Sequence, residues 1–341
     1  MSDSTTHRVT LIPGDGIGPS ISEATVRVVE AAGVKIDWDV QIAGQTAIER
    51  GGDPVPKAVL DSIRQTRVAL KGPVTTPIGM GYRSVNVALR IEFELFANVR
   101  PCASIAGVLA AWPGVDIVIV RENTEGMYAG QELYTGADQS SAVLVAFNTR
   151  KAMLRICRYA FDYARSHGRK KVTAVHKANI MKIFSGILLS CFREVAAEYP
   201  EIETEERIID ATCMEMVRRP QIFDVIVTTN LFGDILSDLA AGLVGGLGLA
   251  PGGNYGDKTA IFEAIHGSAP DIAGKNIANP LGLLMSANMM LRHLNEHEAA
   301  DRIDKSIRMV LSEGKYLTPD LSPGSTHTTT DLTQALVDHL G

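Results

Sequence analysis

The sequence of 341 residues is poor in aromatic residues, poor in cysteine and free of long hydrophobic runs. Aromatic residues make up 6% of it and hydrophobic residues 45%, a balance typical of α/β proteins with aliphatic buried strands. The four cysteines are Cys102, Cys157, Cys191 and Cys213. They lie too far apart for a disulfide framework or a structural zinc site. No apolar stretch approaches the roughly 20 residues that cross a membrane.

The net charge and the N-terminal segment argue against nucleic-acid-binding, secreted and organelle-targeted proteins. The formal net charge is -6 and no block of Lys or Arg is present, which disfavours binding to nucleic acid. Residues 1–7 are polar and lack both the apolar core of a secretory signal and the Arg-rich pattern of a transit peptide. We therefore expect a cytoplasmic protein with no nucleic-acid partner and no membrane partner.

The apolar pattern predicts strands that alternate with helices. Residues 8–12 are predicted as a strand, and residues 21–32 have the spacing of an amphipathic helix that ends at Gly33. Three later runs resemble buried strands, namely Asp116–Val120, Lys171–Val175 and Asp224–Thr228. This alternation, in a chain longer than a usual single domain, predicts an α/β fold in two lobes or one large domain.

Polar clusters follow the three later strands. They are Arg121–Asn123, His176–Asn179, and Asn230 with Asp234 and Asp238. Ligands of open α/β sheets bind beyond the carboxyl ends of the strands. We therefore expect the three clusters to meet in one cleft.

A glycine-rich segment, residues 14–19, follows the first strand and resembles the dinucleotide fingerprint GxGxxG. The third glycine of the fingerprint would fall at Pro19, and no acidic residue closes a second strand about 20 residues later. A tight strand-to-helix turn is the better interpretation, so a cofactor site has to lie elsewhere.

Asp234 and Asp238 lie one helical turn apart, so their carboxylates share a face and repel each other. A hard cation such as Mg²⁺ or Mn²⁺, which prefers oxygen ligands, would compensate them, and Asp210 is a third candidate ligand. For a lone pair of aspartates, a solvated acidic face or pairing with the helix dipole is the more common explanation.

Four basic residues are candidates for a functional site, three as anion-binding groups and one as a base. Arg90, Arg100 and Arg121 lie near segment ends, where a guanidinium group can bind a carboxylate through paired hydrogen bonds. Taken singly, each is more often a partner in a surface ion pair. Lys177 ends a predicted strand, and neighbouring positive charge would lower its pKa towards that of a base. Alone, it is an ordinary exposed lysine.

Five ordered motifs carry a resemblance to a known family. They are Ile12–Gly18, Leu95–Pro101, Arg121–Gly126, Asn230–Asp238 and His266–Lys275. Together they resemble the isocitrate/isopropylmalate dehydrogenase family of β-decarboxylating dehydrogenases, and the likeness covers residues 11–341. The resemblance implies a two-lobed α/β fold that binds its dinucleotide in a non-Rossmann manner.

The resemblance also implies domain boundaries. A large cofactor-binding domain is expected at residues 1–98 and 251–341. A small domain for substrate binding and dimerisation is expected at residues 99–250, with a clasp-like segment near residues 130–148.

The resemblance assigns roles to the candidate residues. The substrate carboxylates would be held by Arg90, Arg100 and Arg121. The metal would be held by Asp234, Asp238 and, from the second subunit, the residue matching Asp210. The base would be a lysine of the second subunit matching Lys177, and Tyr128 would protonate the enol carbon. Such a shared site implies a homodimer or a higher homo-oligomer.

Four polar residues indicate isocitrate as the substrate within the family. Ser84 and Asn86 could hydrogen-bond its additional carboxylate, where isopropylmalate enzymes have apolar residues and homoisocitrate enzymes another basic residue. Thr76 and Asn179 also match the isocitrate pattern, and Asn179 is expected to contact the cofactor as well.

Asp271 and Ile272 predict NAD as the cofactor. An Asp can accept hydrogen bonds from both ribose hydroxyls and would repel a 2′-phosphate, and NADP-type relatives resemble this region but carry Lys-Tyr there. The other expected cofactor contacts are His266, Gly267 and Asn279, the last of them with adenine.

The expected activity is the NAD-dependent oxidative decarboxylation of isocitrate to 2-oxoglutarate and CO2 through metal-bound oxalosuccinate. Three alternatives remain: homoisocitrate dehydrogenase, 3-isopropylmalate dehydrogenase, and a non-catalytic regulatory subunit of a hetero-oligomeric isocitrate dehydrogenase. Retention of Tyr128, Lys177 and the three aspartates argues against the regulatory subunit.

Overall fold

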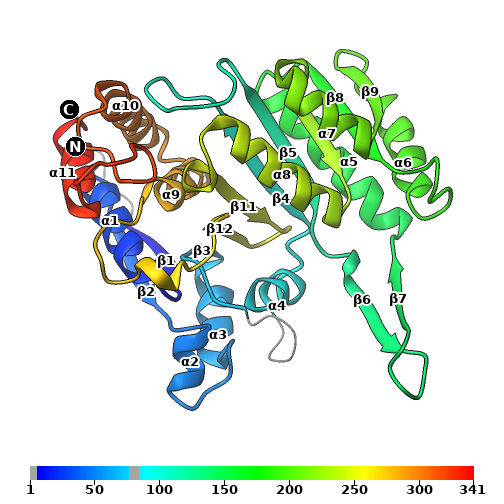
Figure 1. The fold of residues 1–341 in the computed structure, drawn as a ribbon, viewed down its shortest axis with the longest axis horizontal. Coiled ribbons are helices and arrows are strands. Elements are labelled where there is room, and N and C mark those ends of the chain that lie inside the picture. Colours follow the sequence, from blue (N-terminus) through cyan, green and yellow to red (C-terminus); the bar gives the residue numbers. More distant parts are fainter. Residues whose placement is uncertain (1–5, 77–83) are drawn as a thin grey trace. The chain divides into compact units, whose positions relative to one another are not determined.

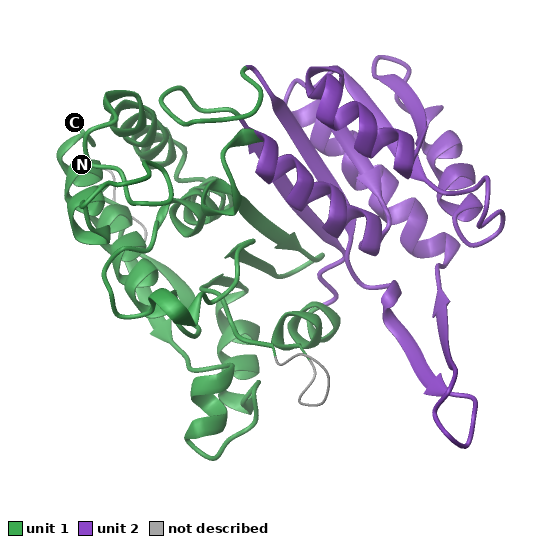
Figure 2. Cartoon of the chain, in the orientation of Figure 1, with its two compact units in different colours: residues 1–93, 104–113, 244–341 green, residues 94–103, 114–243 purple. Residues whose placement is uncertain are grey.

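The computed structural model describes residues 6–76 and 84–341, and the chain forms two compact units (Figure 2). The first unit comprises residues 1–93, 104–113 and 244–341, and the second comprises residues 94–103 and 114–243. The α/β fold class is confirmed, because strands and helices alternate through both units. The expected domain boundaries near residues 98 and 250 stay a prediction, because compactness alone does not show which parts fold or move together.

The strands of the first unit follow one another in the order β2-β1-β3-β12-β11 (Figure 1). Their bounds are β1 His7–Ile12, β2 Ile36–Val40, β3 Val68–Lys71, β11 Pro251–Tyr255 and β12 Ala260–Ala264. All neighbours are parallel except β11 and β12, which run antiparallel. The parallel strands β1 and β3 are buried from residue 9 to 12 and from residue 68 to 71, as strands covered on both faces should be.

The helices of the first unit pack around this sheet. They are α1 Gly18–Ala31, α2 Gln45–Glu49, α3 Lys57–Thr66, α4 Val85–Glu92, α9 Leu281–His293, α10 His297–Glu313 and α11 Thr329–Asp338. The predicted helix at residues 21–32 is confirmed as α1, which starts three residues earlier because Pro19 fits the first helical turn. Short 3-10 helices cover Leu247–Leu249 and Pro270–Ile272.

The strands of the second unit follow the order β4-β5-β10-β8-β9. Their bounds are β4 Ala97–Ala103, β5 Asp116–Glu122, β8 Lys171–His176, β9 Glu203–Ile208 and β10 Val225–Thr228. The three predicted strands are therefore confirmed as β5, β8 and β10. They are parallel neighbours, so their carboxyl ends, and the polar clusters after them, lie at the same edge of the sheet.

The helices of the second unit are α5 Arg150–Ser166, α6 Gly186–Ala196, α7 Ile209–Arg218 and α8 Asn230–Val244, with a 3-10 turn at Pro220–Ile222. A separate antiparallel hairpin of β6 Gly126–Tyr134 and β7 Ala142–Phe147 extends from this unit (Figure 1). This hairpin occupies the segment expected to form a clasp. No helix in the described part of the chain is long and apolar enough to cross a membrane.

The glycine-rich segment after β1 forms a tight turn that ties loops together. Gly16 has φ of +60°, and a Cβ there would lie 2.0 Å from the carbonyl oxygen of Ser268. The Asp15 carboxylate accepts hydrogen bonds from the backbone N–H groups of Gln45 and Thr75, at 3.0 and 2.9 Å. The segment thus has a structural explanation. Gly16 permits the close approach of the Ser268 backbone, and the Asp15 carboxylate satisfies N–H groups of neighbouring loops.

Candidate active site

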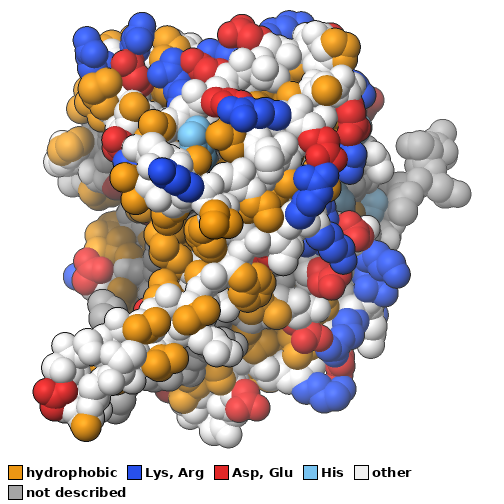
Figure 3. Space-filling view, turned by 90° about the vertical axis from the view of Figure 1, so that its right-hand side faces the viewer, with side chains coloured by type: hydrophobic (Ala, Val, Ile, Leu, Met, Phe, Trp, Pro, Cys, Tyr) orange, Lys and Arg blue, Asp and Glu red, His pale blue; other side chains and the backbone are white. Residues whose placement is uncertain are grey.

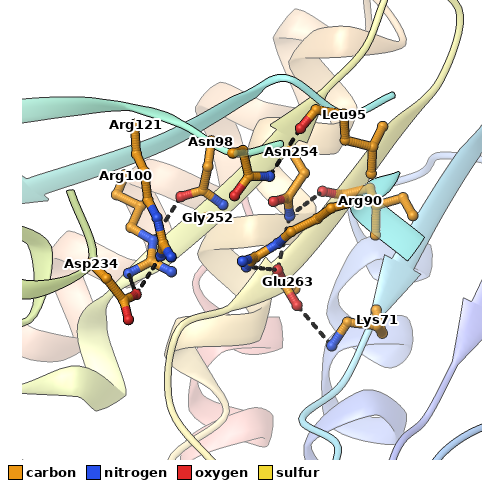
Figure 4. A network of polar contacts seen from close by, with 12 residues as sticks. Lys71, Arg90, Leu95, Asn98, Arg100, Arg121, Asp234, Gly252, Asn254 and Glu263 are labelled. Carbon is orange, nitrogen blue, oxygen red and sulfur yellow. Dashed lines mark hydrogen bonds and ion pairs between the residues drawn. The ribbon is translucent and has the colours of Figure 1, made fainter. Parts of the chain in front are cut away.

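Two buried arginines of the second unit converge on one aspartate (Figure 4). Arg100 of β4 and Arg121 of β5 both donate to Asp234 Oδ1 on α8, and the Arg100 nitrogen lies 3.3 Å from that oxygen. Arg121 is 1% exposed, whereas the side chain of Asp234 is 35% exposed. The cations are therefore sequestered and their common anion faces outward.

Neutral side chains fix the orientation of both guanidinium groups. Asn98 Oδ1 accepts from Arg100 Nε at 2.7 Å, and Asn230 Oδ1 accepts from two nitrogens of Arg121 at 3.1 and 2.7 Å. Asn230 in turn donates to the backbone carbonyl of Glu125 at 3.1 Å. Because these acceptors carry no charge, they hold the arginines without neutralising them.

Gly233 provides the space for the Arg121 side chain. It lies in the first turn of α8, and a Cβ there would lie 2.5 Å from Cγ and 2.6 Å from Cβ of Arg121. Contacts this short cannot form, so α8 can approach β5 closely only with glycine at this position. The Asn230–Asp238 motif therefore includes a steric requirement besides its two acids.

Tyr128 of β6 joins the same cluster. Its hydroxyl donates to Asp234 Oδ2, and its ring lies 5.1 Å from the guanidinium carbon of Arg121. Burial raises the pKa of the Tyr128 hydroxyl, and the hydrogen bond and negative charge of Asp234 raise it further. The hydroxyl consequently keeps its proton at neutral pH.

Asp238 has less compensation than Asp234. Its nearest cationic nitrogen, on Arg100, is 3.7 Å away, and its side chain is 57% exposed. Burial raises the pKa of Asp238, Arg100 acts against this, and the charge of Asp234 adds to it. Two carboxylates on one accessible helix face, one of them poorly compensated, are a donor set that fits a hard divalent cation.

Lys177 and Asp210 form an ion pair with each other in the second unit. Lys177 follows β8, and its backbone N–H donates to Ser185 Oγ at 2.8 Å, which fixes the turn. The Lys177 hydrogen bond lowers the pKa of Asp210.

Across residues 6–76 and 84–341, no three acidic, His or Cys side chains converge as metal ligands. The expectation that Asp210 serves the second subunit's site stays a prediction, as does a cofactor contact from the exposed Asn179.

Arg90 belongs to a buried charge network in the first unit. Glu263 of β12 lies 2.8 Å from the Lys71 ammonium and 3.2 Å from an Arg90 nitrogen, and Asn254 donates to it at 2.9 Å (Figure 4). Burial alone would raise the pKa of Glu263, but the two cations overcome this and hold it far below its ordinary value. Two cations on one carboxylate leave a net positive charge.

The other expected substrate residues surround the start of α4. Ser84 is the residue before its first turn, and Asn86 lies within that turn. The Asn86 side-chain oxygen is buried without a hydrogen-bond partner among the described residues. Thr76 is exposed. A buried, unused acceptor at Asn86 is a feature that a donor on a ligand could satisfy.

A pocket of about 610 Å³ in the first unit brings together most of the expected cofactor residues. Its lining includes His266, Gly267, Ile272 and Asn279. Asp271 is exposed in the 3-10 helix that contributes Ile272. Four of the expected cofactor residues, all between residues 266 and 279, therefore line one cavity.

Sequence reasoning missed Lys71 and Glu263. Each is the only charged residue in a short apolar strand, and the two are register partners on the parallel strands β3 and β12. A lone charge inside an otherwise apolar strand was a usable signal, because such charges are buried only when paired. Asn230 belonged to a predicted polar cluster, and Asn98 and Gly233 lay within the family motifs, but no local signal indicated that these residues support the arginines.

The geometry defines a class: an α/β protein that holds buried arginines beside accessible aspartates and, in its other unit, a pocket lined by apolar and polar groups. The family model for isocitrate/isopropylmalate dehydrogenase matches residues 8–336, so the chain belongs to that family.

Several known proteins are similar to this chain. The NAD isocitrate dehydrogenase catalytic subunit 6, mitochondrial, of Arabidopsis thaliana is 52% identical and covers 99% of this chain and 90% of its own. The chloroplastic 3-isopropylmalate dehydrogenase of Solanum tuberosum is 49% identical, and the match covers 92% of this chain and 88% of that protein. The NADP isocitrate dehydrogenase of Thermus thermophilus is 47% identical, and the match covers 98% of this chain and 68% of that protein.

A solved structure supports the fold. The isocitrate dehydrogenase from Methylococcus capsulatus superposes with a TM-score of 0.96 at 56% identity, covering 98% of this chain and 99% of that one. The names of the plant relatives place those proteins in mitochondria and chloroplasts. The cytoplasmic location expected for this chain therefore stays a prediction.

Replacing Gly233 with Ala should disturb the arginine cluster. The new Cβ would displace Arg121, so we expect the free energy of unfolding to fall by about 1–3 kcal/mol and turnover to drop at least tenfold. Gly242→Ala on the same helix is the matched control, because its Cβ meets no atom within 4 Å. It should stabilise by up to about 1 kcal/mol. Equal effects of the two substitutions in urea titrations and rate assays would contradict this account.

Replacing Glu263 with Gln should leave Lys71 and Arg90 as uncompensated buried cations. We expect a loss of about 3–5 kcal/mol at neutral pH, measured by urea unfolding. Because the folded-state pKa of Glu263 is depressed, the wild type keeps this contribution above the unfolded-state pKa of about 4.3 and loses it progressively as pH falls from there towards the folded-state pKa. The deficit of the variant should therefore be constant from about pH 5 to 8. Combining Glu263→Gln with Lys71→Met should recover part of the lost stability. If Glu263→Gln alone were as stable as the wild type, the network would have no stabilising role.

Proposed function

We propose that the protein catalyses NAD-dependent oxidative decarboxylation of isocitrate to 2-oxoglutarate and CO2. The observation that carries the proposal is the buried pair Arg100 and Arg121, which share Asp234 beside the Tyr128 hydroxyl. Two oriented, buried cations that share a single carboxylate keep positive charge for an anionic ligand, and guanidinium groups match carboxylates in shape. The identity to an NAD isocitrate dehydrogenase over almost the whole chain supports this choice of activity.

Substrate carboxylates would compete with Asp234 for the arginines. The Asn98 and Asn230 side chains keep the two guanidinium groups oriented in the absence of substrate, so little reorganisation accompanies binding. Arg90 would hold a further carboxylate, because its network carries surplus positive charge. The unused acceptor of Asn86 would take a hydrogen bond from the substrate hydroxyl or a bridging water.

Proton movements would be divided between a lysine and a tyrosine. The Lys177 that the second subunit contributes would leave its ion pair with Asp210, lose its own proton to solvent, and then accept the proton of the substrate hydroxyl. Tyr128 keeps its proton at neutral pH because of its raised pKa, so it would donate to the carbon left after CO2 departs. A divalent cation would be held by Asp234, Asp238 and the Asp210 that the second subunit contributes, and it would supply positive charge to stabilise developing oxyanions.

The first unit would bind NAD in the pocket lined by His266, Ile272 and Asn279. Asp271, exposed next to that pocket, would accept hydrogen bonds from the adenosine ribose hydroxyls and repel a 2′-phosphate. The NADP-type relative from Thermus thermophilus is nearly as similar as the NAD-type one, so overall identity does not decide the cofactor. The choice of NAD therefore depends on Asp271 and Ile272.

We propose a homodimer or higher homo-oligomer. Figure 3 shows hydrophobic side chains gathered on the face that the second unit presents. Large exposed hydrophobic residues of this unit include Leu133, Tyr134, Val145, Phe147, Ile180, Ile183, Met214, Val217 and Ile235. Exposed apolar surface of this kind is typical of subunit interfaces. The Arabidopsis relative is named as one numbered catalytic subunit, so a hetero-oligomer is the competing arrangement.

The test of the proposed function is a steady-state comparison of isocitrate, homoisocitrate and 3-isopropylmalate, each with NAD or NADP and with or without Mn²⁺. We expect the highest kcat/KM for isocitrate with NAD and no turnover without the cation. Preference for 3-isopropylmalate would favour the activity named for the Solanum relative. Absence of turnover with all three substrates would favour a regulatory subunit.

Asp271→Lys combined with Ile272→Tyr should shift the cofactor preference towards NADP. The substitution removes the repulsion of a 2′-phosphate and supplies a cation for it. We expect the ratio of kcat/KM for NAD to that for NADP to fall at least about a hundredfold, since opposed charges commonly contribute several kcal/mol to specificity. Lys275→Glu, an exposed charge change in the same loop, is the control and should leave NAD preferred. An unchanged ratio in the double variant would place the ribose contact elsewhere.

A further inference from the structure

Glu122 is a buried acid that has no role in the function proposed above. It ends β5 and is 1% exposed. One of its oxygens accepts from the Thr124 backbone N–H at 2.9 Å and from the Thr124 hydroxyl at 2.6 Å, and the other accepts from the Glu125 N–H at 2.9 Å. Among the residues that the structure describes, no Lys or Arg pairs with it. Because only these donors offset the cost of burying the carboxylate, the turn at residues 123–125 has to keep the shape that presents them.

Glu125 connects that turn to the far end of the hairpin of β6 and β7. Its two carboxylate oxygens accept from the backbone N–H and the hydroxyl of Thr149, at 2.6 and 2.7 Å. Thr149 follows β7 and caps α5, since its hydroxyl also accepts from the Ala152 N–H at 3.2 Å. The Glu125 backbone carbonyl accepts from Asn230 in addition. One side chain therefore joins the residues that flank the hairpin on both sides.

The hairpin itself gives Tyr128 little support. Gly126 pairs with the end of β7, but the register shifts before the next pair at Gln131, so residues 127–130 lie in an irregular stretch. The two strands form a sheet of their own, and an isolated pair of strands is only marginally stable. The base of the hairpin, two residues before Tyr128, therefore decides where β6 presents this side chain.

We propose that Glu122 and Glu125 are positioning residues that place the Tyr128 hydroxyl for its proton transfer. Together they form an acid brace, in which Glu122 fixes the turn and Glu125 ties that turn to the start of α5. The proposal rests on the proposed function, since it assumes that Tyr128 delivers the proton. The Tyr128 hydroxyl donates to Asp234 and its ring faces Arg121, and both contacts require the ring to stay within a narrow range of positions.

Glutamine substitutions distinguish the hydrogen bonds of the acid brace from its charge. In Glu125→Gln the amide oxygen can accept from the Thr149 N–H while the amide nitrogen donates to the Thr149 hydroxyl, so the connection survives without the charge. Glu122→Gln has no such solution. Whichever way its amide turns, the NH2 group meets a backbone N–H, of Thr124 or of Glu125, and leaves that donor unsatisfied.

The test is a double-mutant cycle of Glu125→Ala with Tyr128→Phe, measured as kcat for isocitrate with NAD. Glu125→Ala should lower kcat at least about tenfold, because a displacement of about 1 Å can reduce a rate a hundredfold. If Glu125 acts through Tyr128, it has nothing further to lose once the hydroxyl is gone. The double variant should then match Tyr128→Phe within about twofold. Losses that multiply in the double variant would overturn the proposal.

Four further variants make the result specific. Glu125→Gln should keep kcat within about threefold of the wild type, whereas a loss as large as that of Glu125→Ala would show a role of charge and contradict the brace. Glu122→Gln should lower kcat about as much as Glu125→Ala does. Thr149→Val, at an exposed position where folding is retained, removes one hydrogen bond of the brace and should lower kcat by a smaller factor. Glu132→Ala removes an exposed acid from the same hairpin and should leave kcat unchanged.

A measurement that needs no turnover separates this inference from the proposed function. In protein labelled with fluorotyrosine, the fluorine NMR signal of Tyr128 is the one that disappears in Tyr128→Phe. It should shift in Glu125→Ala and stay in place in Glu132→Ala. An unshifted signal in Glu125→Ala would overturn the inference even if the wild type oxidises isocitrate. If the wild type turns over none of the three substrates, the proposed function fails, while a shifted signal still supports the brace.

Discussion

The ion pairs of Asp234 with Arg100 and Arg121 are the interaction on which the second unit's site depends. Two guanidinium groups buried without an anion would be costly, because desolvation removes their hydration without replacement. Asp234 reduces this cost while remaining partly exposed, so an entering carboxylate has access to the same cations. Gly233 and the amides of Asn98 and Asn230 make this contact possible. The glycine leaves space for Arg121, and the amides orient the two guanidinium groups.

The first unit follows the same rule with different residues. Glu263 compensates Lys71 and Arg90 in the interior, and its own burial is tolerated only because both cations and Asn254 contact it. Each unit therefore compensates buried arginine with a carboxylate, which is partly exposed in the second unit and buried in the first. The accessible Asp234 can be exchanged for a ligand, whereas the buried Glu263 is a permanent part of the fold.

Much of the fold was predictable because its signals are local. The runs that became β5, β8 and β10 are short and mostly apolar, and the polar clusters follow directly in the sequence. The pairing of Lys71 with Glu263 was not predictable in the same way, since it requires the register between β3 and β12, which lie far apart in the chain. The Glu125–Thr149 contact depends likewise on the hairpin that brings its two ends together.

The sequence by itself determined the alternation of strands and helices, the family motifs, and the common helical face of Asp234 and Asp238, because these follow from spacing within a few residues. Only the tertiary structure decided which partner each charged side chain takes. Asp234 binds two arginines, Asp210 pairs with Lys177, and Glu125 holds Thr149. These choices arise from strand register and loop packing, which bring together residues whose separation along the chain carries no information about their distance in space.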